Sequence, residues 1–358
     1  MAAAALKKAL LGTMLLTVLL TLISLGVNEY TWHTQHPQKP SPLLVSLEKT
    51  CRTLHESCRS RWNALTAAVR AKQVGGEAEA RAAAAPPSVK SAYRTAPPLP
   101  ERGDDQLALQ GDFAAILAEK ASSCSIFFLR PRQEQEPLLF QDHAMQPASM
   151  IKLFVLACAM QDAKDGRLSL DEPLSITPEN IVDGAGRLTW YDRGKSLTAL
   201  QLMERMITDS DNTATNILID RLGMRRIDSY IQQKGYAETR LQHKMMLGNQ
   251  GLPNLSSVRD IGTLLTRIYR HECVDPEHDE MMLAILARQT DKECLPAALP
   301  SFRLANKTGE ITGIYADGGI ARGETDDMIL VVMDENCRDR SRTIPLFQKI
   351  AQRAASSL

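Results

Sequence analysis

Strand-like segments lie at both ends of residues 104–358, and a long helical stretch separates them. Short apolar runs typical of strands occupy 124–129, 137–141, 302–307, 319–322 and 328–333. Helical patterns cover 107–120, most of the stretch from 148 to 290, and 341–355. These segments predict a mixed α/β fold, with an antiparallel five-stranded sheet flanked by helices and a separate all-helical lobe. A site would be expected in a cleft between the sheet and the lobe.

The charge balance argues against a nucleic-acid partner. The 358 residues include 42 basic and 42 acidic side chains, so the formal net charge is zero. Proteins that bind nucleic acid usually carry a basic excess that neutralises phosphates. Aromatic residues make up only 5% of the chain, which also disfavours a surface for stacking single strands.

The amino terminus has the pattern of a membrane anchor. Lys7 and Lys8 precede an uncharged run, 9–27, that is about as long as one bilayer crossing. We therefore expect a cytoplasmic tail at 1–8, a transmembrane anchor at 9–27 and an extracytoplasmic remainder. A cleaved signal sequence is the alternative, which would give a secreted protein. The absence of an A-x-A-like site near Gly26 favours the anchor in the cell membrane.

Residues 28–103 have the composition of a stalk and linker. A candidate amphipathic helix at about 43–72 carries an apolar stripe that includes Cys51 and Cys58. The stripe would suit self-association through the stalk, or a helix that lies on the domain or on the membrane. A disulfide between two parallel chains at these cysteines is a hypothesis. An Ala- and Pro-rich segment then leads as a flexible linker to the folded domain, 104–358.

The cysteine pattern does not indicate a metal site. The chain has seven cysteines, an odd number, and no pair has C-x-x-C spacing. Cys124 and Cys158 lie in apolar segments and are expected to be core thiols. His271, Cys273 and His278 are grouped loosely, which fits a polar loop between helices better than a metal site.

A short motif at the start of a predicted helix is the first candidate for chemistry. Pro147 suits a first helical turn, and the apolar run 153–157 predicts burial of the helix that follows. Ser149 and Lys152 would lie one turn apart on the same face. A nearby amine and the positive end of the helix dipole could together activate the serine hydroxyl.

Two further motifs lie where the predicted cleft needs polar groups. Ser210-Asp211-Asn212 falls in a loop between two predicted helices, where a cap of the second helix is the ordinary interpretation. Lys307-Thr308-Gly309 falls at the end of an edge-like strand. There Lys307 could bind a carboxylate, Thr308 offers a hydroxyl, and glycine would let a ligand approach the backbone.

The order of these three motifs resembles that of the serine β-lactamases and penicillin-binding proteins. The residues around two of the motifs are similar to the class A β-lactamase versions of those motifs. They are Met206–Asn216 for the second motif and Lys307–Glu310 for the third. The resemblance covers about residues 107–355. It implies a β-lactamase/transpeptidase-like fold, an acyl-enzyme mechanism, and chemistry that needs no metal or organic cofactor.

The resemblance also implies a role for each matching residue. Ser149 would attack an amide carbonyl, Lys152 is a candidate base, and Ser210 would relay a proton to the leaving nitrogen. The substrate would be bound by Asn212, Lys307, Thr308, Gly309, Asn249 and the backbone N–H of Glu310, which with that of Ser149 would form the oxyanion hole. Trp190 and Tyr191 are candidates for a wall of the cleft, although a core or surface aromatic is the ordinary interpretation of each.

One position departs from the family pattern. Class A enzymes carry a deacylating glutamate on a loop, which Thr239-Arg240-Leu241 introduces here, and counting on places Met245 at that position. The nearest acid, Glu238, precedes the loop. The sequence therefore predicts acylation by β-lactams or related amides without fast hydrolysis of the acyl-enzyme. The alternatives are a penicillin-binding D-Ala-D-Ala carboxypeptidase or transpeptidase acting on peptidoglycan peptides, and a non-catalytic sensor on the same fold.

Overall fold

The computed structural model describes residues 104–133, 135–246 and 252–358. The predicted tail at 1–8, the anchor at 9–27, and the stalk at 28–103 with its two cysteines lie outside the described residues, as does Asn249. Within the described ranges, no helix is both long enough and apolar enough to cross a membrane.

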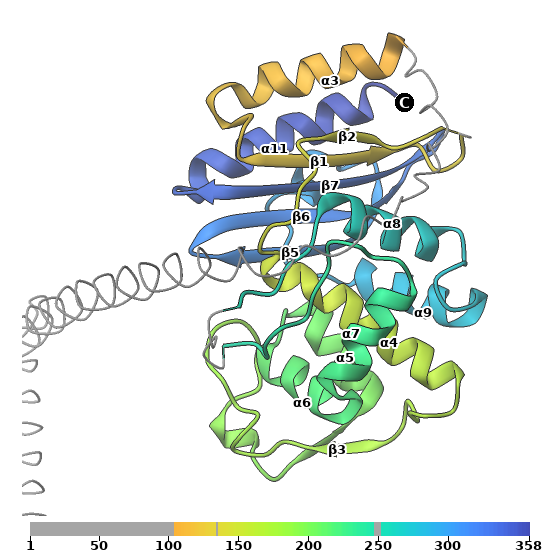
Figure 1. Cartoon of the computed structure of the whole chain (residues 1–358), viewed down its shortest axis with the longest axis vertical. Coiled ribbons are helices and arrows are strands. Elements are labelled where there is room, and N and C mark those ends of the chain that lie inside the picture. Colours follow the sequence, from red (N-terminus) through yellow and green to blue (C-terminus); the bar gives the residue numbers. More distant parts are fainter. Residues whose placement is uncertain (1–103, 134, 247–251) are drawn as a thin grey trace, which may run out of the picture. The chain divides into compact units, whose positions relative to one another are not determined.

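A five-stranded antiparallel sheet forms the centre of the fold (Figure 1). Its strands, in spatial order, are β2 (Leu138–Phe140), β1 (Cys124–Leu129), β7 (Asp327–Cys337), β6 (Gly313–Arg322) and β5 (Arg303–Ile311). The two amino-terminal strands pair with the three carboxyl-terminal strands through β1 and β7. This confirms the predicted sheet built from both ends of the domain.

The hairpin of β5 and β6 is longer than the sequence pattern predicted. β5 and β6 are joined by a tight turn at Gly313, whose φ of +85° favours glycine. The third motif consequently lies inside β5 rather than at its end. Gly318 and Gly319 interrupt the apolar pattern of β6, which explains why only its last residues were predicted as a strand.

The α-helices of the described residues surround the sheet or form the lobe. In chain order they are α3 (Asp104–Leu117), α4 (Lys152–Lys164), α5 (Ala199–Thr208), α6 (Asn212–Leu222), α7 (Met224–Gln233), α8 (Val258–Tyr269), α9 (Pro276–Ala287), α10 (Leu295–Ala298) and α11 (Arg340–Ala355). Helices α3 and α11 lie together on one side of the sheet, and α4 to α7 form the helical lobe (Figure 1). A small hairpin in the lobe, β3 (Pro173–Ser175) with β4 (Ser196–Thr198), was not predicted, since its residues are partly exposed and not apolar in pattern.

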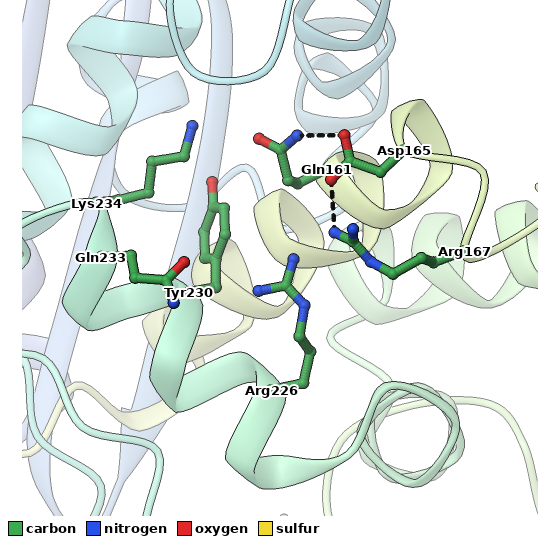
Figure 2. Close-up of a pocket in the computed structure, with 7 residues that line it drawn as sticks. All are labelled: Gln161, Asp165, Arg167, Arg226, Tyr230, Gln233 and Lys234. Carbon is green, nitrogen blue, oxygen red and sulfur yellow. Dashed lines mark hydrogen bonds and ion pairs between the residues drawn. The ribbon is translucent and has the colours of Figure 1, made fainter.

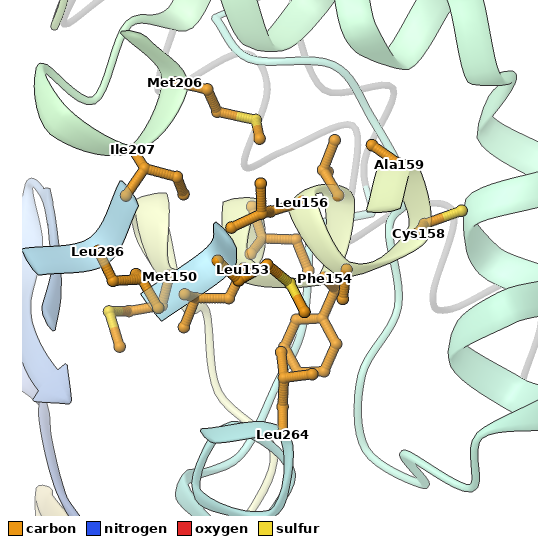
Figure 3. Close-up of a cluster of buried hydrophobic side chains, with 14 of the residues drawn as sticks. Met150, Leu153, Phe154, Leu156, Cys158, Ala159, Met206, Ile207, Leu264 and Leu286 are labelled. Carbon is orange, nitrogen blue, oxygen red and sulfur yellow. The ribbon is translucent and has the colours of Figure 1, made fainter. Parts of the chain in front are cut away.

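Helix α4 is the centre of the larger core (Figure 3). Every side chain from Lys152 to Met160 is buried, as expected of a helix that is apolar on all sides. Phe154 packs edge-on against Tyr236, with ring centroids 5.1 Å apart. A second core lies between the sheet and the α3–α11 pair, and it includes Phe113 and Phe347. Packing therefore fixes the first turn of α4, and with it the residues directly before the helix.

The five cysteines in the described residues are all free thiols. Cys124 and Cys158 are buried, which confirms that they are core residues. Burial raises the pKa of each thiol to about 12, so both remain protonated and unreactive at neutral pH. In the part of the chain that the structure describes, no group of three or more histidine, cysteine or acidic side chains is arranged to hold a metal ion.

Candidate active site

The first motif lies on a short turn immediately before α4. Residues Ala148–Ile151 form a 3₁₀ turn, and the α-helix proper begins at Lys152. Ala148 has φ of +46°, a left-handed conformation that is rare for residues other than glycine. Ser149 is half-buried at this strained turn. Backbone strain of this kind is typical of sites where a side chain must be aimed in one direction.

The second motif connects α5 to α6. Ser210 also has a left-handed backbone, with φ of +54°. Asp211 caps α6, because its Oδ1 accepts a hydrogen bond from the backbone N–H of Ala214 at 2.8 Å. The ordinary interpretation of this tripeptide as a helix cap is therefore correct for Asp211, and the two residues beside it face elsewhere.

Asp211 also fixes a neighbouring loop. Its Oδ2 accepts hydrogen bonds from the backbone N–H groups of Arg187, at 2.6 Å, and Leu188, at 2.8 Å. Gly186 has φ of +122°, and a Cβ at that position would lie 2.4 Å from the Asp211 carboxylate. The fully buried carboxylate thus holds the loop before Trp190 against the second motif. The sequence offered the capping role of Asp211 but no signal for this second one.

Lys152 connects the first motif to the second. Its Nζ donates hydrogen bonds to the backbone oxygen of Ser210 at 2.6 Å, to Ser210 Oγ at 3.2 Å and to Asn212 Oδ1 at 2.8 Å. Among the described residues, its partners are these two and not the hydroxyl of Ser149. The predicted role of Asn212 in holding Lys152 agrees with this contact.

Lys307 reaches the same hydroxyl from the sheet. Its Nζ donates to Ser210 Oγ at 3.1 Å and to the backbone oxygen of Thr308 at 2.6 Å. Ser210 Oγ therefore receives hydrogen bonds from two amines, Lys152 on the lobe and Lys307 on β5. Both lysine side chains are fully buried. The three sequence motifs meet at this one oxygen atom.

Burial changes the protonation of both lysines. It lowers the pKa of Lys152 well below its usual value, and the nearby charge of Lys307 lowers it further, while Asp211 opposes the shift. Burial also lowers the pKa of Lys307 to about 7, and Asp317 and Asp291 oppose that shift. The lowered pKa favours the neutral, basic form of Lys152, and Lys307 changes its charge near pH 7.

Gly309 brings β5 against the turn that carries Ser149. A Cβ at position 309 would lie 2.8 Å from the backbone oxygen of Pro147 and 3.2 Å from the backbone nitrogen of Met150. Only glycine allows this approach. The close contact serves packing of the strand on the turn, whereas the sequence had suggested room for a ligand. It places Thr308 and Glu310 beside the serine turn.

Met245 lies on a loop held by a buried amide. Asn216 on α6 accepts a hydrogen bond from the backbone N–H of Met245 at 2.8 Å and donates one to its backbone oxygen at 3.0 Å. The Met245 side chain belongs to the core of the lobe and is 8% exposed. Glu238 precedes this loop and is exposed, and its backbone N–H donates to Asp260.

The uncharged side chain of Asn254 joins the two ends of the same loop by hydrogen bonds, which we call the clasp. Asn254 Oδ1 accepts from the backbone N–H groups of Gln242, at 2.7 Å, and His243, at 3.1 Å, and Asn254 Nδ2 donates to the His243 backbone oxygen at 3.1 Å. A backbone bridge between Arg240 and Leu255 lies next to it. Sequence reasoning missed Asn216 and Asn254, because buried asparagines carry no pattern that distinguishes them from turn residues.

The two candidate aromatic wall residues are exposed. Trp190 is 52% exposed and Tyr191 is 85% exposed, on the 3₁₀ turn Trp190–Asp192. The guanidinium of Arg193 lies over the Trp190 ring at 5.1 Å. Neither residue belongs to the core, and their role as walls of the cleft stays a prediction.

Comparisons with known proteins agree with this architecture. The model of the family described as "Beta-lactamase enzyme family" matches residues 108–358, more than half of the chain. Among curated proteins, beta-lactamase AER-1 of Aeromonas hydrophila is 29% identical over 164 residues, which cover 43% of this chain and 53% of that protein. The chain therefore matches about half the length of this relative.

Solved structures share the fold over the described domain. PBP-A is 27% identical, with a TM-score of 0.65, over 70% of this chain and 95% of that one. A mutant of PBP-A in an acyl-enzyme complex with penicillin G gives the same identity and TM-score, over 70% and 96%. A beta-lactamase from Sphaerobacter thermophilus, at 22% identity and a TM-score of 0.64 over 70% and 96%, shows likeness of fold alone.

Proposed function

Because the chain belongs to the beta-lactamase enzyme family, we propose that it is an active-site serine hydrolase that forms an acyl-enzyme on Ser149 with β-lactams or related amides. The observation that carries this proposal is the convergence of Lys152 and Lys307 on Ser210 Oγ, with Lys152 three residues after Ser149 at the start of α4. Burial of two amines is unfavourable unless they are hydrogen-bonded, and clustered amines with lowered pKa values are typical of functional sites.

In the proposed acylation, Ser149 Oγ attacks the amide carbonyl carbon. Lys152, neutral because its pKa is lowered, accepts the hydroxyl proton. Ser210 lies within hydrogen-bond distance of Lys152 Nζ. It gives its hydroxyl proton to the leaving nitrogen as the C–N bond breaks, and its oxygen takes the proton that Lys152 had accepted. The products are an ester on Ser149 and a neutral amine, with Lys152 returned to its neutral form.

Substrate recognition follows from the position of β5. The charged form of Lys307 and the hydroxyl of Thr308 bind the substrate carboxylate, and Asn212 binds a side-chain amide. The backbone N–H groups of Ser149 and Glu310 donate to the carbonyl oxygen, where one such donor is typically worth about 3 kcal/mol. Asn249 stays a predicted contact of this site, from outside the described residues.

Release of the acyl group is proposed to be slow. The sequence pattern of the loop predicts a glutamate at position 245, where this chain has Met245, and a thioether cannot accept a proton from water. The likeness to PBP-A, of which a mutant is described as an acyl-enzyme with penicillin G, supports a penicillin-binding role. The second candidate is therefore a D-Ala-D-Ala carboxypeptidase or transpeptidase, which the predicted membrane anchor and stalk would place near the peptidoglycan. The retained lysines disfavour a non-catalytic sensor.

A pair of assays tests the proposal on the full chain. Fluorescent penicillin is expected to label the protein covalently, while a chromogenic cephalosporin turns over slowly or not at all. Ser149→Ala should abolish labelling, with its thermal melting curve as the control for folding. Fast turnover would overturn slow deacylation and identify a lactamase. Labelling that persists in Ser149→Ala would overturn the assignment of the nucleophile.

A further inference from the structure

A cavity of about 590 Å³ lies at the carboxyl-terminal end of α4 (Figure 2). Ser149 lies at the other end, on the turn before this helix begins. It is lined by Gln161, Asp165, Arg167, Arg226, Tyr230, Gln233 and Lys234. Lys152 begins α4 and Lys164 ends it, so the two sites are about 18 Å apart along the helix. None of the residues of the candidate active site lines this cavity.

The cationic side chains that line this cavity outnumber the carboxylates that pair with them. Arg167 and Arg226 both direct Nε and Nη2 to a single oxygen, Oδ1 of the buried Asp162. Arg167 Nη2 also donates to Asp165, which lies at the rim. Lys234 Nζ donates to the backbone oxygen of Cys273 at 2.7 Å and has no acidic partner among the described residues. Three positive groups thus face two carboxylates, which leaves one positive charge uncompensated.

Several hydrogen-bond donors that line the cavity have no partner among the described residues. In the described part of the chain, Nη1 of Arg167, Nη1 of Arg226 and the side-chain amide of Gln233 have no hydrogen-bond partner. Guanidinium groups have only donors to offer, and two of them fixed by one carboxylate suit an acceptor-rich ligand. An oxyanion with several oxygen atoms would satisfy these donors and the excess charge together.

The cations are also held in position before any ligand arrives. The side chains of Arg226 and Lys234 lie against the ring of Tyr230, with the guanidinium carbon 6.0 Å and Nζ 5.6 Å from its centroid. Tyr230 is itself buried, and its hydroxyl contacts Cys273 Sγ at 3.7 Å. Side chains that are already ordered lose less conformational entropy on binding.

We infer that this cavity binds a small, multiply charged oxyanion, such as a phosphate or polycarboxylate group, at a site distinct from the candidate active site. Arg167, Arg226 and Lys234 supply the positive charge, and the amides of Gln161 and Gln233 complete the polar lining. The alternative is a purely structural ion network that joins α4 to α7, which would bind no ligand.

Calorimetric titration of the full chain with pyrophosphate, at fixed ionic strength, tests this inference. We expect saturable binding with one site per chain. Gln233→Glu adds a negative charge at an exposed side chain that has no bond to lose, and Lys234→Gln removes a positive one. Each is expected to weaken binding about tenfold, the loss typical of one charge-assisted contact. Citrate as a second probe distinguishes carboxylate from phosphate, and binding of either supports the shared chemistry.

The matched control is Gln352→Glu, the same change at an exposed position of α11, outside the cavity. It should leave the affinity for pyrophosphate unchanged, and melting curves should show that all variants fold. The inference is overturned if neither probe binds the unaltered protein. It is equally overturned if Gln352→Glu weakens binding as much as Gln233→Glu, because binding would then follow net charge alone. Neither readout depends on acylation of Ser149.

Discussion

Met245 is the residue on which the proposed slow deacylation rests. Met245→Glu would place a carboxylate on a backbone that Asn216 already fixes by two hydrogen bonds. We expect the half-life of the penicillin-labelled protein to fall by about 100-fold, which is at the lower end of what a general base contributes. The measurement is the loss of label after removal of free penicillin.

Two controls isolate the carboxylate of this variant. Met245→Gln has the shape of the glutamate without a basic oxygen, and Met246→Glu puts the same charge on the next residue, whose side chain is 60% exposed. Neither should shorten the half-life. A label that persists equally in Met245→Glu would show that position 245 does not face the acyl group.

The titration of Lys307 predicts how the rate of acylation falls on the basic side of its pH profile. Its pKa of about 7 means that the amine loses its positive charge as the pH rises through neutrality. The second-order rate of acylation by a penicillin that carries a carboxylate should therefore fall between about pH 6.5 and 8.5. In Lys307→Arg the cation keeps its charge, so this fall should move to higher pH. An unchanged basic limb in that variant would assign the titration to another group.

Ala148 tests whether the strained turn serves to aim Ser149. Its left-handed backbone is unfavourable for residues with a Cβ, and most unfavourable for β-branched ones. Ala148→Val should destabilise the fold by about 1–2 kcal/mol and slow acylation, whereas Ala148→Gly should change stability little. Urea unfolding and penicillin labelling measure the two effects. Equal stability of the two variants would indicate that the turn carries no strain.

At the scale of elements, the loop that carries Met245 depends on its clasp. Asn254 is 7% exposed and makes three hydrogen bonds across the neck of the loop. Asn254→Ala leaves those backbone groups unpaired and should lower the free energy of unfolding by about 2–3 kcal/mol. Asn254→Asp keeps the acceptor for Gln242 and His243 and should lose less. Urea unfolding measures both, and an alanine variant as stable as the aspartate variant would contradict the clasp.

The elements also show how far sequence reasoning reaches. Apolar runs predicted β1, β7 and the buried α4, because burial on both faces leaves a continuous signal. They missed the last residues of β5, where the third motif replaces apolar residues, and most of β6, where paired glycines do so. The motifs identified which side chains meet at Ser210 Oγ. They could not indicate the backbone strain at Ala148 or the second role of Asp211, since both depend on neighbours distant in the sequence.

For the whole molecule, the buried lysines predict how stability depends on pH. The unfolded chain binds protons at both lysines up to about pH 10.5, whereas the folded protein releases the Lys307 proton near pH 7. Because the unfolded state binds more protons in this range, the free energy of unfolding should rise with pH, by up to about 1.4 kcal/mol per pH unit from Lys307. Buried thiols such as Cys124 oppose this trend near and above pH 9, since their pKa is raised in the fold.

The prediction is checked by urea unfolding at pH 7.0, 7.7 and 8.5. Lys307→Met removes one titrating group and should flatten the rise, while Lys195→Met, at an exposed lysine with a 65% exposed side chain, should leave it intact. A slope that is the same in Lys307→Met and in the unaltered protein would contradict a neutral Lys307 in the folded state at these pH values.

The pairing of β1 with β7 has a consequence for synthesis of the chain. Cys124 lies opposite Asp334, so the first strand of the sheet has no partner on its inner edge until almost the whole domain has been made. The loop to be closed is long, and the apolar side chains of β1 remain exposed in the meantime. The turn of Ser149 likewise lacks its contact with Gly309 until β5 emerges. A nascent or truncated chain would therefore carry the serine motif without a reactive site, and activity would report completion of the polypeptide.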